Sequence, residues 1–250
     1  MAEQTVVFIS GTSSGIGKAL AEHYLSKPNH TVIGSVRDDT TPSVAELKSF
    51  KPASGSSLLL VHIESTSPDD PAKALVAIEA AGVKHIDIVY ANAGGSPPVL
   101  PMDDVPVKDL LSSFQTNAVG PFVLFQTLKP LLQKSKAPKW AAISSISGSI
   151  GMMGTLGTHI TVAYGASKAA LNWLTRAIHC SQPWLITVAF HPGLVQTGPG
   201  NWIARKIGME QAPTTIDESV SNLVKKLEEA TRDNYSGKFI NAIDGNEIPW

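Results

Sequence analysis

The 250-residue chain contains one cysteine, Cys180, and this scarcity excludes both an internal disulfide framework and a metal site built from several cysteines. A lone cysteine fits a reducing compartment, where we expect it to be buried as a small hydrophobic side chain. Charged residues make up only 16% of the chain, and the formal net charge is −1. This balance disfavours binding to nucleic acid or to an anionic membrane surface. The composition therefore predicts no multi-cysteine metal site and no nucleic-acid or membrane partner.

Long hydrophobic runs are also absent. No apolar stretch reaches the roughly 18 residues that a membrane span needs. Residues 1–4 lead directly into a strand-like run rather than into a signal peptide. We therefore expect a cytoplasmic protein. The length of 250 residues suits one large α/β domain or two small ones and is enough to bury a full core.

Strand-like and helix-like segments alternate along nearly the whole chain, with no long linker and no repeat. This alternation predicts one Rossmann-type α/β domain over residues 1–250, a doubly wound parallel sheet with helices on both faces. Ligands bind such a sheet beyond the carboxyl ends of its strands. Strands are expected over 5–9, 31–36, 58–63, 86–90, 140–145, 185–190 and 239–242; helices over 18–25, 71–81, 109–132, 163–177 and 216–231; a short helix with a loop at 42–57; a loop at 96–107; and a mobile flap at 198–213.

A glycine-rich turn follows the first expected strand. It places Gly11, Gly15 and Gly17 around Thr12 to Ser14, directly before a helix. Glycines at such a turn leave room for a pyrophosphate beside the free N–H groups of a helix start. The G-x-x-x-G-x-G spacing alone is a moderate signal, and an ordinary strand-to-helix connection is the alternative.

Arg37 ends the second expected strand. In a dinucleotide-binding fold, an acidic residue there binds the ribose 2′-hydroxyl of NAD(H), whereas an arginine can bind the 2′-phosphate of NADP(H). Arg37 therefore favours NADP(H), with NAD(H) as the weaker alternative. Asp38 and Asp39 follow directly and can reduce that preference, and a solvated loop arginine is the other interpretation.

Tyr164 and Lys168 are four residues apart in a segment that is rich in helix-forming residues and free of proline. On a helix the two side chains share one face. A lysine ammonium beside a phenol favours the phenolate and lowers a pKa that is otherwise about 10. The pair can then exchange a proton with a reacting oxygen. Taken alone the pattern is weak, and a surface tyrosine beside a surface lysine is the alternative.

These motifs occur together with Asn92-Ala93-Gly94, Asn117, Ser145 and Pro192-Gly193. In this order they resemble the short-chain dehydrogenase/reductases over essentially the whole chain, and among them the fungal branch that contains norsolorinic acid ketoreductases. The resemblance implies an NAD(P)(H)-dependent oxidoreductase that acts on a small-molecule carbonyl substrate. It also implies a homodimer or homotetramer.

The resemblance implies roles for individual residues. Tyr164 would protonate the carbonyl oxygen as hydride arrives, and Ser145 would hydrogen-bond the same oxygen. Lys168 would lower the pKa of Tyr164 and bind the nicotinamide ribose, and Asn117 would hold a water that links Lys168 to solvent. The implied cofactor-binding residues are Gly11, Ser13, Gly15, Ile16, Gly17, Arg37, Ile63, Asn92, Tyr164, Lys168, Val195 and Thr197.

Three features depart from the family pattern. Ala91 replaces an asparagine that steadies the central strand, and His62 replaces an aspartate that contacts adenine. The gap between Ser145 and Tyr164 is longer than usual, so residues 151–159 must loop out if the two side chains are to meet. Ser144 and Ser147 lie close enough in sequence to be alternatives to Ser145.

The sequence favours an NADPH-dependent reductase that acts on an aromatic polyketide-like or other bulky ketone. A large apolar pocket wall is expected from Met152, Met153, Leu156, Trp202, Ile203 and Met209, whereas His159 and His191 are assigned to packing or loop hydrogen bonding. One alternative is a non-redox biosynthetic enzyme on the same fold, such as an epimerase, dehydratase or cyclase. A cofactor-sensing binding protein is a weaker alternative, because a sensor does not need a proton relay.

Overall fold

Seven parallel strands form one sheet in the computed structural model, which describes residues 4–250. They lie in the order β3-β2-β1-β4-β5-β6-β7. The predicted doubly wound Rossmann-type sheet is confirmed. The strands are β1 (Thr5–Ser10), β2 (His30–Val36), β3 (Ser57–His62), β4 (Ile88–Ala91), β5 (Lys139–Ile143), β6 (Ile186–His191) and β7 (Phe239–Asn241).

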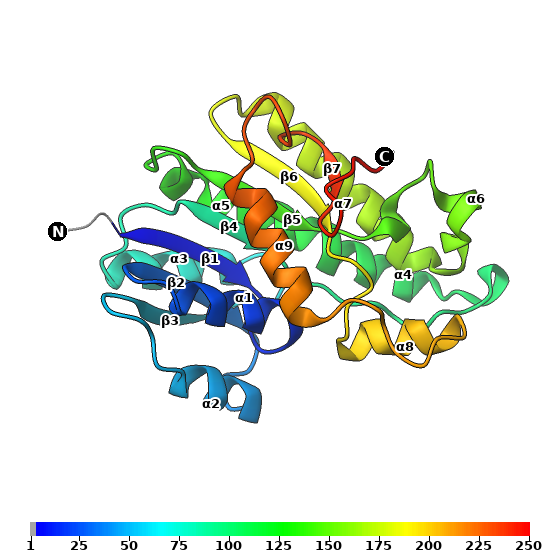
Figure 1. Cartoon of the computed structure of the whole chain (residues 1–250), viewed down its shortest axis with the longest axis horizontal. Helices are drawn as coiled ribbons and strands as arrows, with labels where there is room; N and C mark the ends of the chain where they lie inside the picture. The colour runs from blue at the N-terminus through cyan, green and yellow to red at the C-terminus, as the bar shows by residue number, and fades with distance from the viewer. Residues whose placement is uncertain (1–3) are drawn as a thin grey trace.

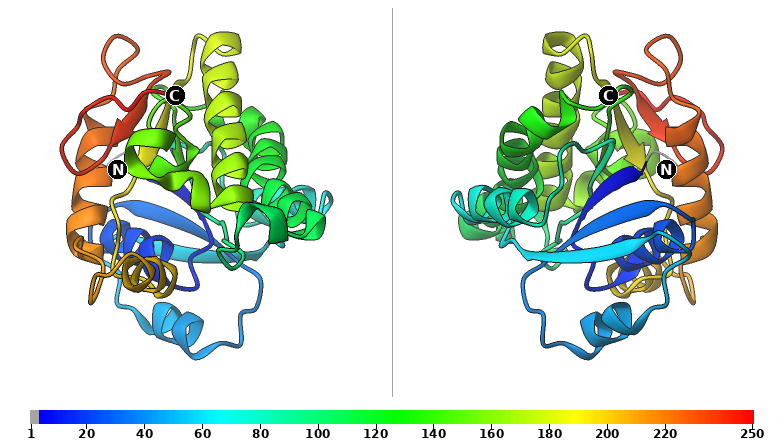
Figure 2. Two further views of the ribbon diagram at one scale, coloured as in Figure 1. Left: turned by 90° about the vertical axis from the view of Figure 1, so that its right-hand side faces the viewer. Right: turned by 90° about the vertical axis from the view of Figure 1, so that its left-hand side faces the viewer.

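Helices cover both faces of this sheet (Figures 1 and 2). Helices α1 and α9 pack on one face, and α3, α5 and α7 pack on the other. The helices are α1 (Gly15–Leu25), α2 (Pro42–Ser49), α3 (Asp70–Ala80), α4 (Val107–Phe114), α5 (Gly120–Leu132), α6 (Met153–Leu156), α7 (Val162–Ser181), α8 (Gly198–Lys206) and α9 (Ile216–Glu228). Short 3-10 turns are η1 (Met102–Asp104), η3 (Ile146–Gly148) and η4 (Thr158–Ile160), and η2 (Gln115–Val119) is a π-turn.

Alternation along β1 builds the two layers of the core. Val7 and Ile9 belong to the cluster under α1 and α9, whereas Val6 and Phe8 belong to the cluster under α3 and α5. Successive side chains of a strand point to opposite faces, so a continuous apolar run is what a sheet covered on both sides requires.

The chain changes direction across the sheet between β1 and β4, which are neighbours although β2 and β3 come between them in sequence. The hydroxyl of Ser10, at the end of β1, accepts the N–H groups of Asn92 and Ala93, each at 2.9 Å. These two bonds fix the chain after β4, where Ala91 offers no polar side chain. A ligand crevice is expected at this switch point.

The helix predicted over 109–132 is continuous but irregular. It consists of α4, the π-turn η2 and α5. Pro121 has no N–H, so it cannot donate to the carbonyl of Asn117 four residues earlier, as a regular α-helix would require. The π-turn accommodates this missing bond. Such turns are frequent at functional sites, and this one carries Asn117.

One expectation needs correction. Cys180 is exposed on α7 rather than buried, because it lies on the side of the helix that faces away from the sheet. The segment 198–213, predicted as a mobile flap, contains α8 in its first half, and the Thr197 hydroxyl accepts the Gly200 N–H at 3.2 Å to cap that helix. Over residues 4–250, every helix is too short or too polar to span a bilayer.

Candidate active site

Tyr164 and Lys168 lie on the first two turns of α7, at the carboxyl edge of β5. The Lys168 Nζ sits 5.6 Å from the centroid of the Tyr164 ring and donates to the carbonyl of Ile143 at 2.7 Å. Lys168 is only 4% exposed. The sequence spacing therefore places a buried ammonium against the face of the phenol ring.

Burial controls the acidity of both groups. It raises the pKa of the Tyr164 phenol, and a side-chain hydrogen bond with Ser145 partly opposes that shift. Burial also lowers the pKa of Lys168 to about 8, because no carboxylate compensates the desolvation of its charge. The predicted lowering of the Tyr164 pKa by Lys168 is therefore wrong in its net direction, since desolvation of the phenol outweighs the opposing influences.

Ser145 is the serine whose side chain interacts with the Tyr164 phenol, and this interaction works against the rise in the Tyr164 pKa. Its hydroxyl also accepts the N–H of Ser147 at 3.2 Å, which fixes the turn η3 after β5. The neighbouring Ser144 points elsewhere: its hydroxyl is buried and donates to Asn172 Oδ1 at 2.6 Å. The two adjacent serines therefore have separate environments, and only Ser145 faces the phenol.

This separation predicts opposite results for two matched substitutions. With the role predicted for Ser145 from the family resemblance, Ser145→Ala would remove a hydrogen bond to the reacting oxygen, so we expect kcat to fall by about 10- to 100-fold with little change in stability. Ser144→Ala leaves Asn172 short of a partner, so we expect kcat to be kept and the melting temperature to fall by about 2–4 °C. Steady-state kinetics and thermal unfolding of both variants distinguish the two. The assignment of Ser145 would be wrong if Ser144→Ala were the variant with impaired turnover.

The Asn117 side chain is fully buried and fully used in hydrogen bonds. Its Oδ1 accepts the N–H of Gly95 at 2.9 Å, while Nδ2 donates to the carbonyl of Gly95 at 2.8 Å and to the hydroxyl of Ser167 at 2.9 Å. Asn117 thus joins the chain after β4 to α7. Both hydrogens of the Asn117 amide are already donated, so they cannot bind the water of the predicted relay. That water would instead donate to the main-chain carbonyl of Asn117, which receives no hydrogen bond from Pro121 because proline has no N–H.

The glycine-rich turn is closely packed. Gly11 and Gly15 adopt φ values of +73° and +55°, which disfavour side chains. A Cβ on Gly17 would overlap the carbonyl of Gly11 and come within 2.5 Å of Asn92 Nδ2. Asn92 Nδ2 itself donates to the carbonyl of Ser10 at 2.9 Å. The turn is therefore a shaped cradle at the start of α1, whose first-turn N–H groups suit a phosphate.

The remaining predicted cofactor residues lie along the same edge. The Ser13 side chain is partly buried and Ile16 follows it in the first turn of α1. The methyl group of Thr197 lies 3.2 Å from the Cβ position of Gly15, so the chain after β6 covers the glycine-rich turn. Ile63 and Val195 are 7% and 4% exposed, so their side chains mainly fill the core.

Arg37 lies at the open end of this edge. Its side chain is 75% exposed and forms an ion pair with Glu64 at 3.9 Å, a distance that holds the guanidinium only loosely. His62 stands where the family has an aspartate that contacts adenine. Its Nε2 lies 3.2 Å from the Asp70 carboxylate. Hydrogen bonds from the Glu64 N–H and from Ser67 lower the pKa of Asp70 to about 2.

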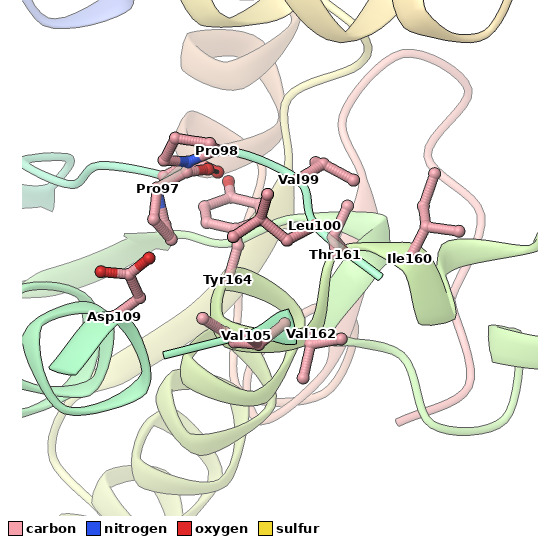
Figure 3. Close-up of a pocket in the computed structure, with 12 residues that line it drawn as sticks. Pro97, Pro98, Val99, Leu100, Val105, Asp109, Ile160, Thr161, Val162 and Tyr164 are labelled. Atoms are coloured by element: carbon pink, nitrogen blue, oxygen red, sulfur yellow. Dashed lines mark hydrogen bonds between the residues drawn. The ribbon is translucent and has the colours of Figure 1, made fainter. Parts of the chain in front are cut away.

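A pocket opens beside the Tyr164 ring (Figure 3). It lies between residues 96–100, which are rich in proline, and the segment 160–164 at the start of α7, with Val105 and Asp109 on a third side. The sequence pattern predicts only a loop at 96–107, although the four prolines of this segment indicate a stiff chain suited to forming a wall. None of the six apolar residues predicted as a wall lines this pocket, but Met153, Leu156, Trp202 and Met209 are 38–49% exposed.

The insertion at 151–159 loops out, as the sequence required. It forms α6 and leads through η4 into the pocket wall at Ile160. The last residues of the chain hold its base: the Gly151 N–H donates to the Trp250 carbonyl at 3.0 Å, and the Ser149 hydroxyl donates to the carbonyl of Pro249. The Trp250 ring stacks on Phe239 with centroids 5.8 Å apart.

His191 supports the site without facing the pocket. Its Nδ1 accepts the N–H of Ile146 at 3.3 Å, next to Ser145, and burial lowers its pKa to about 4. The neutral ring therefore remains an acceptor at physiological pH. His159 is exposed on η4. Within the part of the chain that the structure describes, no group of three or more histidine, cysteine or acidic side chains is arranged to hold a metal ion.

Comparison with known proteins identifies relatives of the whole chain. The short-chain dehydrogenase srdF of Neurospora crassa is 55% identical over 251 residues, covering 99% of this chain and 98% of that protein. The norsolorinic acid ketoreductase of Aspergillus parasiticus is 35% identical over 250 residues, covering 99% and 92%. The NADPH-bound carbonyl reductase from chicken fatty liver has a TM-score of 0.86 at 27% identity and covers 99% and 100% of the two chains.

A family model for short chain dehydrogenases matches residues 5–207. That range includes the glycine-rich turn, Asn117, Ser145 and the Tyr164–Lys168 pair. The match agrees with the sheet order and with the relatives at full coverage. The chain therefore belongs to the short-chain dehydrogenase/reductase family of oxidoreductases.

Proposed function

We propose that this enzyme uses NADPH to reduce a bulky, aromatic or polyketide-like ketone to a secondary alcohol. The observation that carries the proposal is the meeting of Tyr164, Ser145 and Lys168 beside a largely apolar pocket at the carboxyl edge of the sheet. This geometry fits a carbonyl oxygen between the phenol and the serine hydroxyl.

The nicotinamide dinucleotide supplies the hydride when it is bound. The residues present fit such a group, because Gly11 and Gly15 adopt φ values that favour glycine and the turn leads into the uncapped first turn of α1, whose free N–H groups suit a phosphate. In the proposed reaction, Ser145 orients the carbonyl and Tyr164 gives its proton to the oxygen. Lys168 faces the phenol ring and stabilises the phenolate that remains.

A raised phenol pKa suits this direction of reaction. Because burial keeps the Tyr164 hydroxyl protonated, the proton is available for the developing alkoxide, which is a stronger base than the phenolate. The hydrogen bonds of Asn117 to Gly95 and Ser167 hold α7 against the chain after β4. Asn117 is therefore proposed as a positioning residue whose main-chain carbonyl offers a site for a relay water.

The preference for NADPH rests on Arg37, which is exposed and loosely paired at the end of β2. We expect Arg37→Ala to raise the KM for NADPH by about 10-fold, since a charged hydrogen bond to a 2′-phosphate is lost, and to leave the KM for NADH nearly unchanged. Lys48→Ala is a matched control, because Lys48 is a nearby cation already engaged by Asp39 at 3.1 Å. Equal effects of Arg37→Ala on both cofactors would contradict the preference.

The substrate class is supported by the apolar pocket and by relatives named norsolorinic acid ketoreductases. Initial rates of NADPH oxidation across small aliphatic, monocyclic and polycyclic ketones test it. A preference for polycyclic ketones is the expected result, and a clear preference for small polar ones would overturn it. If no ketone causes loss of nicotinamide absorbance while mass spectrometry finds a converted product, the non-redox alternative replaces the reductase.

A homodimer or homotetramer in the cytoplasm is also proposed from the family resemblance. Apolar side chains are exposed on the outer surface of α4 and α7, where Leu111 is 65% and Trp173 is 71% exposed. Apolar area of this kind supports self-association.

A further inference from the structure

The pocket beside Tyr164 contains one charged side chain. Its walls are mostly apolar and come from Pro97, Pro98, Val99, Leu100, Val105, Ile160 and Val162, and its few polar members include Ser96 and Thr161. Asp109 is the only ionisable lining residue besides Tyr164 itself. Figure 3 shows its side chain projecting from α4 toward Pro97, into the region that the Tyr164 ring also borders.

The Asp109 carboxylate has no partner among residues 4–250. The hydrogen bonds of this residue use only its main chain: its N–H donates to the Pro106 carbonyl at 2.9 Å, and its carbonyl accepts from the Ser112 hydroxyl at 3.2 Å. Asp109 lies in the first turn of α4, where an acidic residue favours the helix dipole. That role does not require the carboxylate to face a pocket, and no side chain caps this helix.

A bound ketone would displace water from this carboxylate. A buried polar group that loses water without gaining a partner is strongly unfavourable, so a ligand without a donor would bind poorly here. A ligand that places a donor against Asp109 would avoid that penalty. A few convergent polar groups in an apolar pocket commonly fix orientation in this way.

We propose that Asp109 is a specificity-determining residue that selects ketones carrying a hydroxyl group at a second position. This inference rests on the proposed reductase function. With the carbonyl between Tyr164 and Ser145, the second group would lie toward α4 and donate to the Asp109 carboxylate. A hydroxyl needs one acceptor, which Asp109 provides, whereas an ammonium has three donors to satisfy and a full charge to desolvate.

The test compares an aryl ketone with its ring-hydroxylated counterparts, one for each ring position, using NADPH. For the wild-type enzyme we expect kcat/KM to be about 10- to 100-fold higher for at least one hydroxylated ketone. Asp109→Ala should bring that ratio close to one. Asp109→Asn should retain part of the preference, because the amide oxygen still accepts a hydrogen bond. Val105→Ala is the control, since it alters the same pocket and should affect both ketones alike.

An unchanged ratio in Asp109→Ala would overturn the assignment, as would a stronger preference of the wild type for an amine-bearing ketone. Ligand-induced shifts of the melting temperature separate this inference from the reductase proposal. If the wild type reduces none of these ketones, a larger shift with the hydroxylated ketone, present in the wild type and lost in Asp109→Ala, would still support the subsite. Equal shifts in both proteins would reject it.

Discussion

Replacement of Tyr164 by phenylalanine should lower kcat by about 10²- to 10⁴-fold, which is the usual contribution of a general acid. The variant keeps the ring that faces the Lys168 ammonium at 5.6 Å, so the local packing is retained. It loses the hydroxyl, and with it both the transferred proton and the interaction with the Ser145 side chain. Single-turnover reduction of a ketone and fluorescence titration with NADPH should show lost chemistry and preserved cofactor binding.

A second tyrosine provides a matched control. Tyr235 also lies beneath a lysine, with Lys226 Nζ 5.9 Å from its ring centroid, but it precedes the start of β7 and so lies at the amino end of that strand rather than at the carboxyl edge of the sheet. Tyr235→Phe should therefore leave kcat unchanged. If Tyr164→Phe retained more than about a tenth of the wild-type turnover, far above the loss expected for a missing acid, another group would have to supply the proton.

Replacement of Lys168 by methionine should abolish most turnover and yet stabilise the protein at neutral pH. The pKa of Lys168 is lowered from 10.5 to about 8, so burying its charge costs the folded state about 3 kcal/mol. Methionine removes that cost, but it leaves the Ile143 carbonyl without its partner, which costs about 1 kcal/mol. The net expectation at pH 7 is a stabilisation of about 2 kcal/mol.

The stability gained by replacing Lys168 with methionine should depend on pH. Below pH 8 the lysine is charged in both the folded and unfolded states, so the folded wild type bears the whole penalty. Between pH 8 and 10.5 the unfolded chain binds the extra proton, and the stability of the wild type rises with pH. Denaturant unfolding at pH 7 and near 10.5 should therefore show the advantage of Lys168→Met shrinking. If the difference in unfolding free energy between Lys168→Met and the wild type stayed constant over this range, a pKa of Lys168 lowered by burial would be contradicted.

Much of the fold was accessible from the sequence because local pattern and tertiary environment agree. The apolar runs of β1 and β6 are strands buried on both faces, and the glycine-rich turn lies directly after β1, as predicted. The proline at 121 indicated an interruption in the helix over 109–132. The π-turn forms because Pro121 cannot donate a hydrogen bond to the carbonyl of Asn117, and the hydrophobic periodicity of the sequence does not reveal this.

The details of the site depended on contacts between distant segments. Spacing brought Tyr164 and Lys168 to one helix face, but only the packed structure shows that burial dominates the acidity of both. The two adjacent serines looked alike in sequence, and Asn172, which binds Ser144, distinguishes them. The pocket role of Asp109 had no local signal, since an acidic residue in the first turn of a helix is common for other reasons.

The π-turn η2 also sets the rotation of α4 about the helix axis relative to α5. It therefore sets the directions in which Asp109 on α4 and Asn117 in the turn point. A π-turn contains one residue more than the α-turn it replaces. Deleting a single residue within Gln115–Val119 would remove that extra residue and would rotate α4 against α5 by about 100°. Asp109 could then no longer face the pocket while Asn117 binds Gly95. Homologues with and without this extra residue should therefore differ in the ketones they accept, even where every reacting side chain is the same.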